Sequence, residues 1–160
     1  MIDAIDKAAG LSPDDALFET RRFRPEFVQG AELCRLSVLQ PANTQALGHD
    51  FRLAVALRIA SLNSDTSLID DYSTQLDALD ADAATLAFAK GEVNLEQPLA
   101  AIARHVDLVT LTPSEAQAGD IRLLELAGLD SGQIVALSEL IAFVNFQAKV
   151  ASGLRLMRLL

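Results

Sequence analysis

One short stretch of the chain gathers a carboxylate and a phenol where an expected helix begins. Asp65, Asp70, Asp71 and Tyr72 lie near the start of that helix, which we expect over residues 66–79. A carboxylate and a phenol in a partly apolar pocket could bind a small polar ligand or transfer protons. The structural alternative, which we favour, is that Asp65 caps the helix, Asp70 and Asp71 are solvated, and Tyr72 fills space.

Arg58 is a further polar residue of interest in this region. It lies on an expected helix over residues 49–62, which is apolar almost all round. A buried guanidinium must find an anion or a carbonyl oxygen. Arg58 is therefore expected either to pair with a nearby acid or, together with Asp65 and Tyr72, to bind a ligand.

Cysteine and histidine are too sparse to predict a thiol pair or a metal site. Cys34 is the chain's one cysteine, which excludes an intramolecular disulfide, a CxxC redox pair and a cysteine-rich zinc site. It lies among apolar residues of an expected helix, so we expect a buried, unreactive thiol. His49 and His105 have no His, Cys or acid three or four residues ahead, and Asp107 lies two residues after His105. We predict no metal and no cofactor.

Charge and hydropathy exclude two classes of partner. The 160 residues carry a net charge of −9, whereas phosphate backbones are bound by clustered Lys and Arg, so we expect no nucleic acid. Polar residues interrupt the most apolar region, residues 134–160, so we expect no membrane span. The first residues lack the basic start and apolar stretch of a signal peptide, and we expect a cytoplasmic protein.

The composition predicts an all-α fold. Half of the residues are apolar but only 5% are aromatic, and Ala and Leu, which favour helices, are abundant. Pro and Gly fall between periodic stretches, so we place about seven or eight helices in a single multi-helix bundle. Besides the two helices named above, we expect helices over residues 12–21, 25–40, 82–90, 98–111 and 113–126 and a final one of about 25 residues from residue 131.

We expect residues 1–24 to form an N-terminal extension with a short helix, and residues 25–160 to form one globular unit. The final helix carries more apolar residues than one stripe of a small bundle can hide. Some of that surface is expected to meet another subunit, which predicts a homo-oligomer.

The stretch from Leu47 to Tyr72 also carries a family pattern. It resembles the central helical hairpin of the carboxymuconolactone decarboxylase and alkylhydroperoxidase D-like superfamily, especially its peroxidase-related members. The positions that match this frame are Arg52, Ala56, Leu57, Arg58, Ile59, Ala60 and Asn63. Residues 120–147 resemble the C-terminal part of the same proteins. The resemblance extends over residues 25–157 and implies a helical bundle of the alkylhydroperoxidase D-like type.

The resemblance also implies a redox site whose residues this chain lacks. In active members two thiols of a Cys-x-x-Cys motif reduce a peroxide, while an acid and a histidine relay protons. The thiol positions here are Asp65 and Leu68, Ser67 lies between them, Tyr72 replaces the relay histidine and Leu53 replaces the upstream glutamate. Neither Asp nor Leu can form a sulfenate or a disulfide. The implied site is therefore degenerate, and no residue is assigned as catalytic.

Three functions remain open at this point. The first is a degenerate member of the superfamily that acts as a binding or accessory protein. The resemblance implies a dimer or hexamer, with an active relative or a small molecule as a candidate partner. The second is a non-redox enzyme, decarboxylase-like or isomerase-like, that uses Asp65, Tyr72 and Arg58. The third is a residual peroxidase-related antioxidant activity through Cys34.

Overall fold

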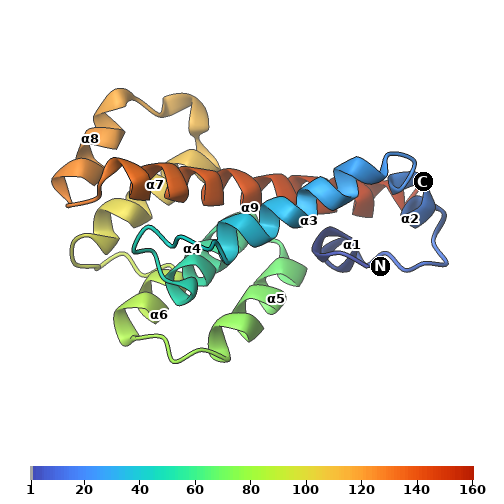
Figure 1. The fold of residues 1–160 in the computed structure, drawn as a ribbon, viewed down its shortest axis with the longest axis horizontal. Helices are drawn as coiled ribbons and strands as arrows, with labels where there is room; N and C mark the ends of the chain where they lie inside the picture. Colours follow the sequence, from blue (N-terminus) through green and yellow to red (C-terminus); the bar gives the residue numbers. More distant parts are fainter. Residues whose placement is uncertain (1) are drawn as a thin grey trace.

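The computed structural model describes residues 2–160, and all regular structure in this part of the chain is helical. The longest helix, α9, runs along the length of the molecule, and the other helices pack around it (Figure 1). The predicted all-α fold is confirmed. The helices are α1 (Ala4–Ala9), α2 (Ala16–Arg21), α3 (Pro25–Leu39), α4 (His49–Leu62), α5 (Thr66–Asp77), α6 (Ala83–Ala89), α7 (Leu99–Leu111), the 3₁₀ turn η1 (Pro113–Glu115), α8 (Ala118–Leu126) and α9 (Ser131–Met157).

The central helix is α4, which packs against α3, α5, α6, α7 and α9. A helix that is apolar nearly all round needs neighbours on every side. The fully buried residues of α4 are Leu53, Ala54, Val55, Ala56, Ile59 and Ala60. The bounds of α4 are those expected from the sequence.

The long final helix supplies one wall of the hydrophobic core. By length and composition α9 could cross a membrane, but half of its most apolar window is buried inside the chain. That burial accounts for much of its apolar character. The residues that α9 buries are Ile134, Leu137, Leu140, Ile141, Phe143, Val144, Gln147, Ala148 and Ala151.

Aspartate side chains fix where three of the helices begin. The carboxylates of Asp65, Asp82 and Asp130 each accept a hydrogen bond from the backbone N–H three residues ahead. This contact satisfies one of the backbone donors that a helix leaves unpaired at its start. The predicted cap at Asp65 is therefore confirmed, and Asp82 and Asp130 cap α6 and α9 in the same way.

The helix expected over residues 113–126 begins later than predicted. Pro113–Glu115 form only the turn η1, and α8 begins at Ala118. Asp120 provides the competing cap, because its carboxylate accepts from the backbone of Gln117 at 2.8 Å and pairs with Arg104 at 2.7 Å. A cap reinforced by a tertiary ion pair outweighs the local pattern at residues 112–115.

The first helix was not predicted from the sequence. Asp3 and Asp6 form a reciprocal capping box at its start, and Gly10 ends it in the left-handed conformation that glycine favours. Helix α1 packs against α9 and α5. The N-terminal residues that join the common hydrophobic core are Ala8, Ala9, Leu11 and Phe18.

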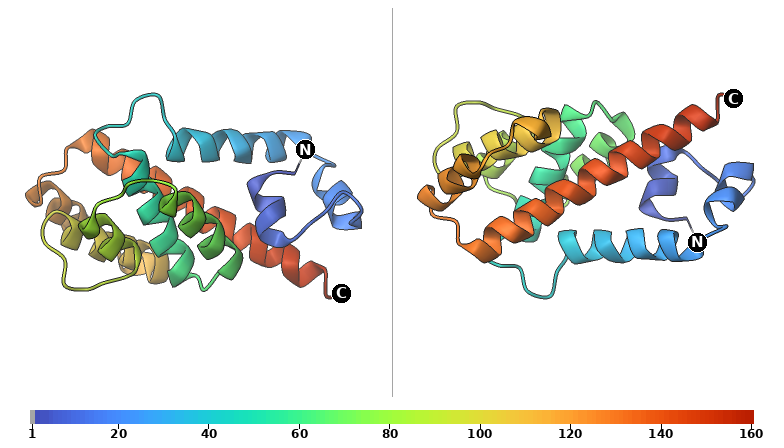
Figure 2. Two further views of the ribbon diagram at one scale, coloured as in Figure 1. Left: turned by 90° about the horizontal axis from the view of Figure 1, so that it is seen from below. Right: turned by 90° about the horizontal axis from the view of Figure 1, so that it is seen from above.

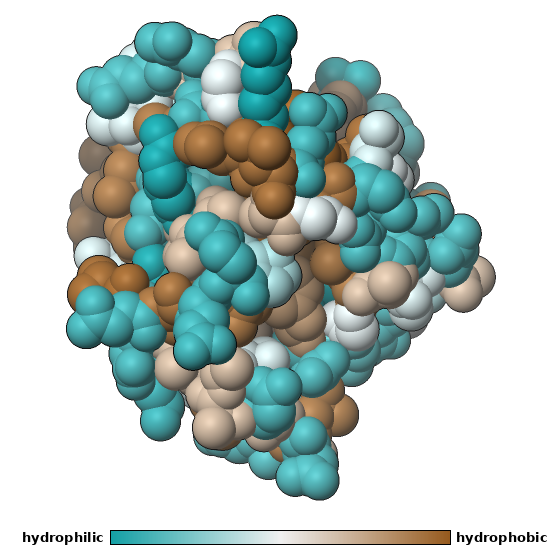
Figure 3. Space-filling view, turned by 90° about the vertical axis from the view of Figure 1, so that its left-hand side faces the viewer, coloured by the Kyte–Doolittle hydropathy of each residue, from teal (hydrophilic) through white to brown (hydrophobic). Residues whose placement is uncertain are grey.

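Polar and apolar side chains are unevenly distributed over the surface of the molecule. At the end where α7 and α8 lie, polar side chains cover most of the surface and separate the apolar patches from one another (Figure 3). Scattered apolar residues of this kind are normal on a protein surface. Helix α3 lies on the outside of the bundle, where it packs against α9 and α4 (Figure 2).

Candidate functional site

The candidate site lies where α5 begins, at the first thiol position implied by the family resemblance. Asp65 is the N-cap residue of α5, and its side chain is only 3% exposed. One carboxylate oxygen accepts from the backbone N–H of Leu68 at 3.2 Å. The predicted capping role of Asp65 is thus confirmed.

A second contact of Asp65 was not predicted. The guanidinium of Arg155, near the end of α9, donates from Nη2 to Oδ2 of Asp65 at 2.6 Å and from Nη1 to Oδ1 at 3.3 Å. Both carboxylate oxygens are therefore engaged by one arginine. Two-point pairing of this kind is among the stronger polar contacts in proteins.

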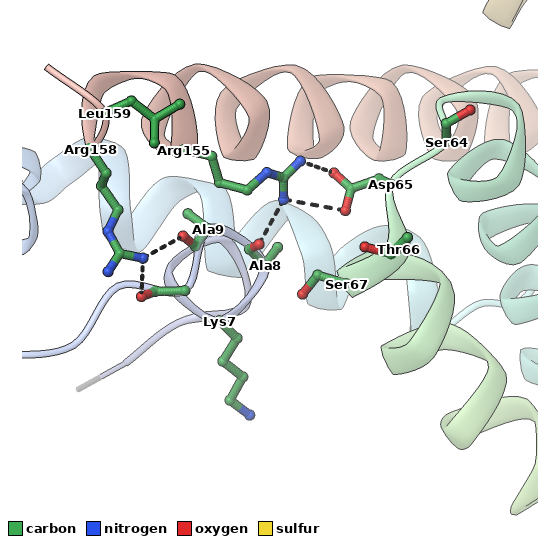
Figure 4. Close-up of a pocket in the computed structure, with 11 residues that line it drawn as sticks. Lys7, Ala8, Ala9, Ser64, Asp65, Thr66, Ser67, Arg155, Arg158 and Leu159 are labelled. Carbon is green, nitrogen blue, oxygen red and sulfur yellow. Dashed lines mark hydrogen bonds and ion pairs between the residues drawn. The ribbon is translucent and has the colours of Figure 1, made fainter.

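The same region ties the two ends of the chain together. Nη1 of Arg155 also donates to the carbonyl of Ala8 at 2.7 Å, and Nη1 of Arg158 donates to the carbonyl of Gly10 at 2.8 Å. These carbonyls lie at the C-terminal end of α1, where a helix has unpaired acceptors and a partial negative charge. Figure 4 shows the two arginines reaching from α9 to this end of α1.

A pocket of about 620 Å³ opens beside these contacts, between α1, the start of α5 and the end of α9. Three of its side chains are cations and one is an acid, while three others are hydroxyls. The residues that line it are Lys7, Ala8, Ala9, Gly10, Ser64, Asp65, Thr66, Ser67, Arg155, Arg158 and Leu159. The balance of charge in the pocket suits a small anion better than a cation.

Two further positions to which the family resemblance points are part of the protein interior. Leu68, at the second thiol position, is 1% exposed, and Leu53, at the upstream acid position, is fully buried. Both belong to the main hydrophobic core. Ser67 is half-buried and lines the pocket. Leu53 and Leu68 therefore stabilise the fold and offer no polar group to a ligand.

Tyr72, at the position that the resemblance implies for a relay histidine, forms a buried hydrogen bond. Its hydroxyl donates to Oε1 of Gln147 at 2.5 Å, and both side chains are buried. Burial, and then the negative charge of Asp71, raise the pKa of Tyr72 well above its ordinary value. The phenol therefore stays protonated near neutral pH and donates to the amide. Gln147 and this contact gave no signal in the sequence, since the two residues lie far apart in the chain.

Arg58 does not join Asp65 and Tyr72. It forms a two-point ion pair with Asp107 on α7, at 2.7 Å for each contact, and donates to the carbonyl of Phe88 at 2.9 Å. The structural pair considered for Arg58 is therefore the one found. The three residues considered together as a ligand site have separate partners.

The exposure of Cys34 differs from the prediction. We expected a buried thiol, but the residue is exposed on α3 and lines a groove between α3 and α9. The prediction was wrong because α3 buries only its last two residues, Val38 and Leu39. Apolar neighbours along the chain do not bury a side chain when its helix lies on the outside of the bundle.

Neither histidine lies in a metal-binding cluster. Residues 2–160 contain no group of three or more His, Cys, Asp or Glu side chains placed to hold a metal ion. His49 is hydrogen-bonded through Nδ1 to the carbonyl of Leu39 at 2.9 Å. His105 is buried, and its Nδ1 has no hydrogen-bond partner in the described part of the chain.

Comparison with known structures identifies the architecture. An uncharacterized peroxidase-related protein from Silicibacter sp. TM1040 has a similar structure, with a TM-score of 0.72 and 15% sequence identity over 95% of this chain and 79% of that chain. This chain shares the fold of that protein. No family model and no curated protein matches the sequence. The similarity therefore establishes the fold, and the chemistry has to be argued from the site.

Proposed function

We propose that the chain is a catalytically degenerate relative of the carboxymuconolactone decarboxylase and alkylhydroperoxidase D-like proteins, acting as a binding or accessory protein in a homo-oligomer. One observation carries the proposal. Asp65 stands at the first thiol position with both carboxylate oxygens held by Arg155. A carboxylate cannot be oxidised to a sulfenate or close a disulfide, so thiol redox chemistry has no starting group here.

The environment of Tyr72 supports the same conclusion. A relay group must take up and release a proton near the working pH. Burial raises the pKa of the Tyr72 phenol, and its hydroxyl already donates to Gln147. Tyr72 therefore acts as a structural residue in this position.

The pocket beside Asp65 supports a binding role. Lys7, Arg155 and Arg158 outnumber the single acid among its side chains. In a chain with a net charge of −9 this local excess of cations favours a small anion, such as a carboxylate or inorganic phosphate. Isothermal titration with acetate, citrate and phosphate tests this role, and heat from citrate or phosphate that is absent with neutral glycerol is the expected result.

The enzymatic alternatives require changes that the structure does not favour. A non-redox enzyme using Asp65, Tyr72 and Arg58 would have to break two internal ion pairs and bring separated side chains together. A peroxidase through Cys34 would use a thiol on the outer face of α3, away from the degenerate motif on α5.

A peroxide consumption assay with a dithiol reductant separates these functions. We expect no turnover above the buffer for the natural chain or for Cys34→Ser. Turnover that is lost in Cys34→Ser would establish the one-cysteine peroxidase. Turnover that survives in Cys34→Ser would establish a non-thiol enzyme, and either result would overturn the proposed function.

A further inference from the structure

Helix α3 exposes an unusual amount of apolar surface for a helix on the outside of a bundle. Of its 15 residues only Val38 and Leu39 are buried. An outer helix face normally carries charged side chains. The large apolar residues exposed on α3 and just before it are Phe23 (86%), Phe27 (60%), Leu33 (66%) and Leu36 (40%).

Apolar grooves flank α3 on both sides. The first, of about 600 Å³, lies between α3 and α9 and is lined by Phe27, Cys34, Val38, Phe143 and Phe146 among others. The second, of about 620 Å³, runs along the opposite side of α3 past Pro25, Val28 and Leu33. Helix α3 is therefore a ridge between two apolar hollows, and in Figure 2 it stands along the outside of the bundle.

Gly30, in the middle of α3, points to a close neighbour on this face. Glycine inside a helix costs about 0.5–1 kcal/mol relative to alanine. A Cβ atom added at Gly30 would have no atom of this chain within 4 Å. Glycine at this position therefore leaves room for another helix to approach α3 closely.

The order of large and small side chains along this face indicates which helix can pack against it. Phe27, Gly30, Cys34 and Ser37 follow one another at spacings of three and four residues and are all exposed, so they form one seam along α3. The seam is large at its N-terminal end and small over the rest. When such a helix is laid against an antiparallel copy of itself, the large end meets the small end.

We propose that α3 pairs with α3 of a second copy of this chain, antiparallel, about a two-fold axis between Gly30 and Cys34. Phe27 then lies opposite Ser37 of the second copy, and Gly30 lies opposite its Cys34. Such an isologous contact requires one surface that complements itself, which this seam provides. The charged residues in the middle of α3, Glu32 and Arg35, pair with each other at 2.7 Å on a different face of the helix.

The area involved fits a dimer. The exposed parts of Phe27, Leu33 and Phe146, the large apolar side chains nearest the seam, amount to roughly 350 Å², within the range of the largest patch on a monomer. A standard interface covers about 800 Å² on each partner, and a polar rim supplies the remainder. This surface includes Phe146 of the final helix, where the sequence predicts self-association, and the inference deepens the proposed function by naming the contact surface.

The test compares two glutamate substitutions in the full chain by analytical ultracentrifugation at micromolar concentrations. Gly30→Glu places two charges beside the axis, while Gly153→Glu alters an exposed helical glycine of α9 that likewise has no neighbour within 4 Å. We expect the particle mass to be halved in Gly30→Glu and unchanged in Gly153→Glu. Circular dichroism checks that both variants are folded.

Accessibility of Cys34 provides a second measurement. In a single chain the thiol is exposed, so its alkylation should be slower in the natural chain than in Gly30→Glu. A monomeric natural chain, or an unchanged mass in Gly30→Glu, would overturn the proposal. A monomeric natural chain would overturn the homo-oligomer of the proposed function as well, whereas an unchanged mass in Gly30→Glu overturns this surface alone.

Discussion

The hydroxyl of Tyr72 on α5 donates to Oε1 of Gln147 on α9 at 2.5 Å, with both side chains buried. Nε2 of Gln147 has no hydrogen-bond partner in the described part of the chain. A buried polar group that loses its partner costs more than a hydrogen bond contributes when it forms. Each of these two buried side chains therefore depends on the other for its hydrogen bond.

Removing the hydroxyl should destabilise the fold. Tyr72→Phe leaves both polar atoms of Gln147 unpaired, and we expect a loss of about 1–3 kcal/mol in the free energy of unfolding. The double variant Tyr72→Phe/Gln147→Met should lose less than the sum of the single variants, because it removes both partners. Urea denaturation of the four proteins measures this coupling, and strictly additive losses would contradict it.

The pair of Arg58 and Asp107 should be sensitive to loss of the acid. Arg58 is 5% exposed, so Asp107→Asn leaves a buried charge without its partner, which costs about 3–5 kcal/mol when the charge is fully desolvated. The side chain of Asp107 is 34% exposed, so we expect the lower end of that range. Asp80→Asn, at an exposed acid, is the control and should stay within about 0.5 kcal/mol. Equal thermal midpoints for the two variants would refute the prediction.

Asp65 has two roles that substitutions can separate. Asparagine caps helices as well as aspartate does, so Asp65→Asn removes mainly the charge that pairs with Arg155, at a cost of about 2 kcal/mol. Asp65→Ala also removes the cap and should cost about 1 kcal/mol more. Asp70→Asn changes an exposed acid of the same helix and serves as the control. The order of the urea midpoints checks this account, and it would be wrong if Asp65→Asn and Asp70→Asn unfolded together.

The burial of His105 predicts that the fold loses stability in mild acid. Burial lowers the pKa of His105, with a smaller lowering from Arg104, against an opposing effect of Asp120. The unfolded chain, with an ordinary pKa of about 6.5, therefore binds a proton that the folded chain refuses. The free energy of unfolding should be steady above that pH and fall as the pH drops below it, until the lowered pKa of the folded state is reached.

The contribution of His105 can be isolated by substitution. His105→Gln should make the free energy of unfolding depend less on pH between about pH 7 and pH 5.5, where an ordinary histidine titrates. The backbone N–H of Gln117 and the guanidinium of Arg104 lower the pKa of Asp120, so its contribution is lost only in stronger acid. Urea midpoints across this range provide the measurement, and an equally steep fall in His105→Gln would assign the effect to other groups.

Elements that depend on local chemistry could be predicted from the sequence. The apolar pattern of α4 gave its bounds, and the aspartate caps of α5, α6 and α9 were visible as turn residues before periodic stretches. Helix α1 was missed although Asp3 and Gly10 carry the signals of a start and an end. Six residues are too few for a periodic pattern to stand out.

Contacts between distant helices could not be predicted. Helical spacing shows which face of α9 carries Arg155 but not which acid it meets, and Asp65 lies 90 residues away along the chain. The exposure of Cys34 depends on where α3 lies in the bundle, which its own sequence does not determine. The residue types at Asp65 and Tyr72 could be compared with the family pattern from the sequence alone, whereas the partners that hold Asp65, Tyr72 and Arg58 became visible only in three dimensions.

The arginines that reach from α9 to α1 set an order of events during synthesis. The carbonyls of Ala8 and Gly10 accept hydrogen bonds from Arg155 and Arg158, which lie 147 and 148 residues further along the chain and are synthesised long after α1. Closing a loop that spans nearly the whole chain is entropically costly and slow. These contacts of α1 can therefore form only after α9 has been synthesised.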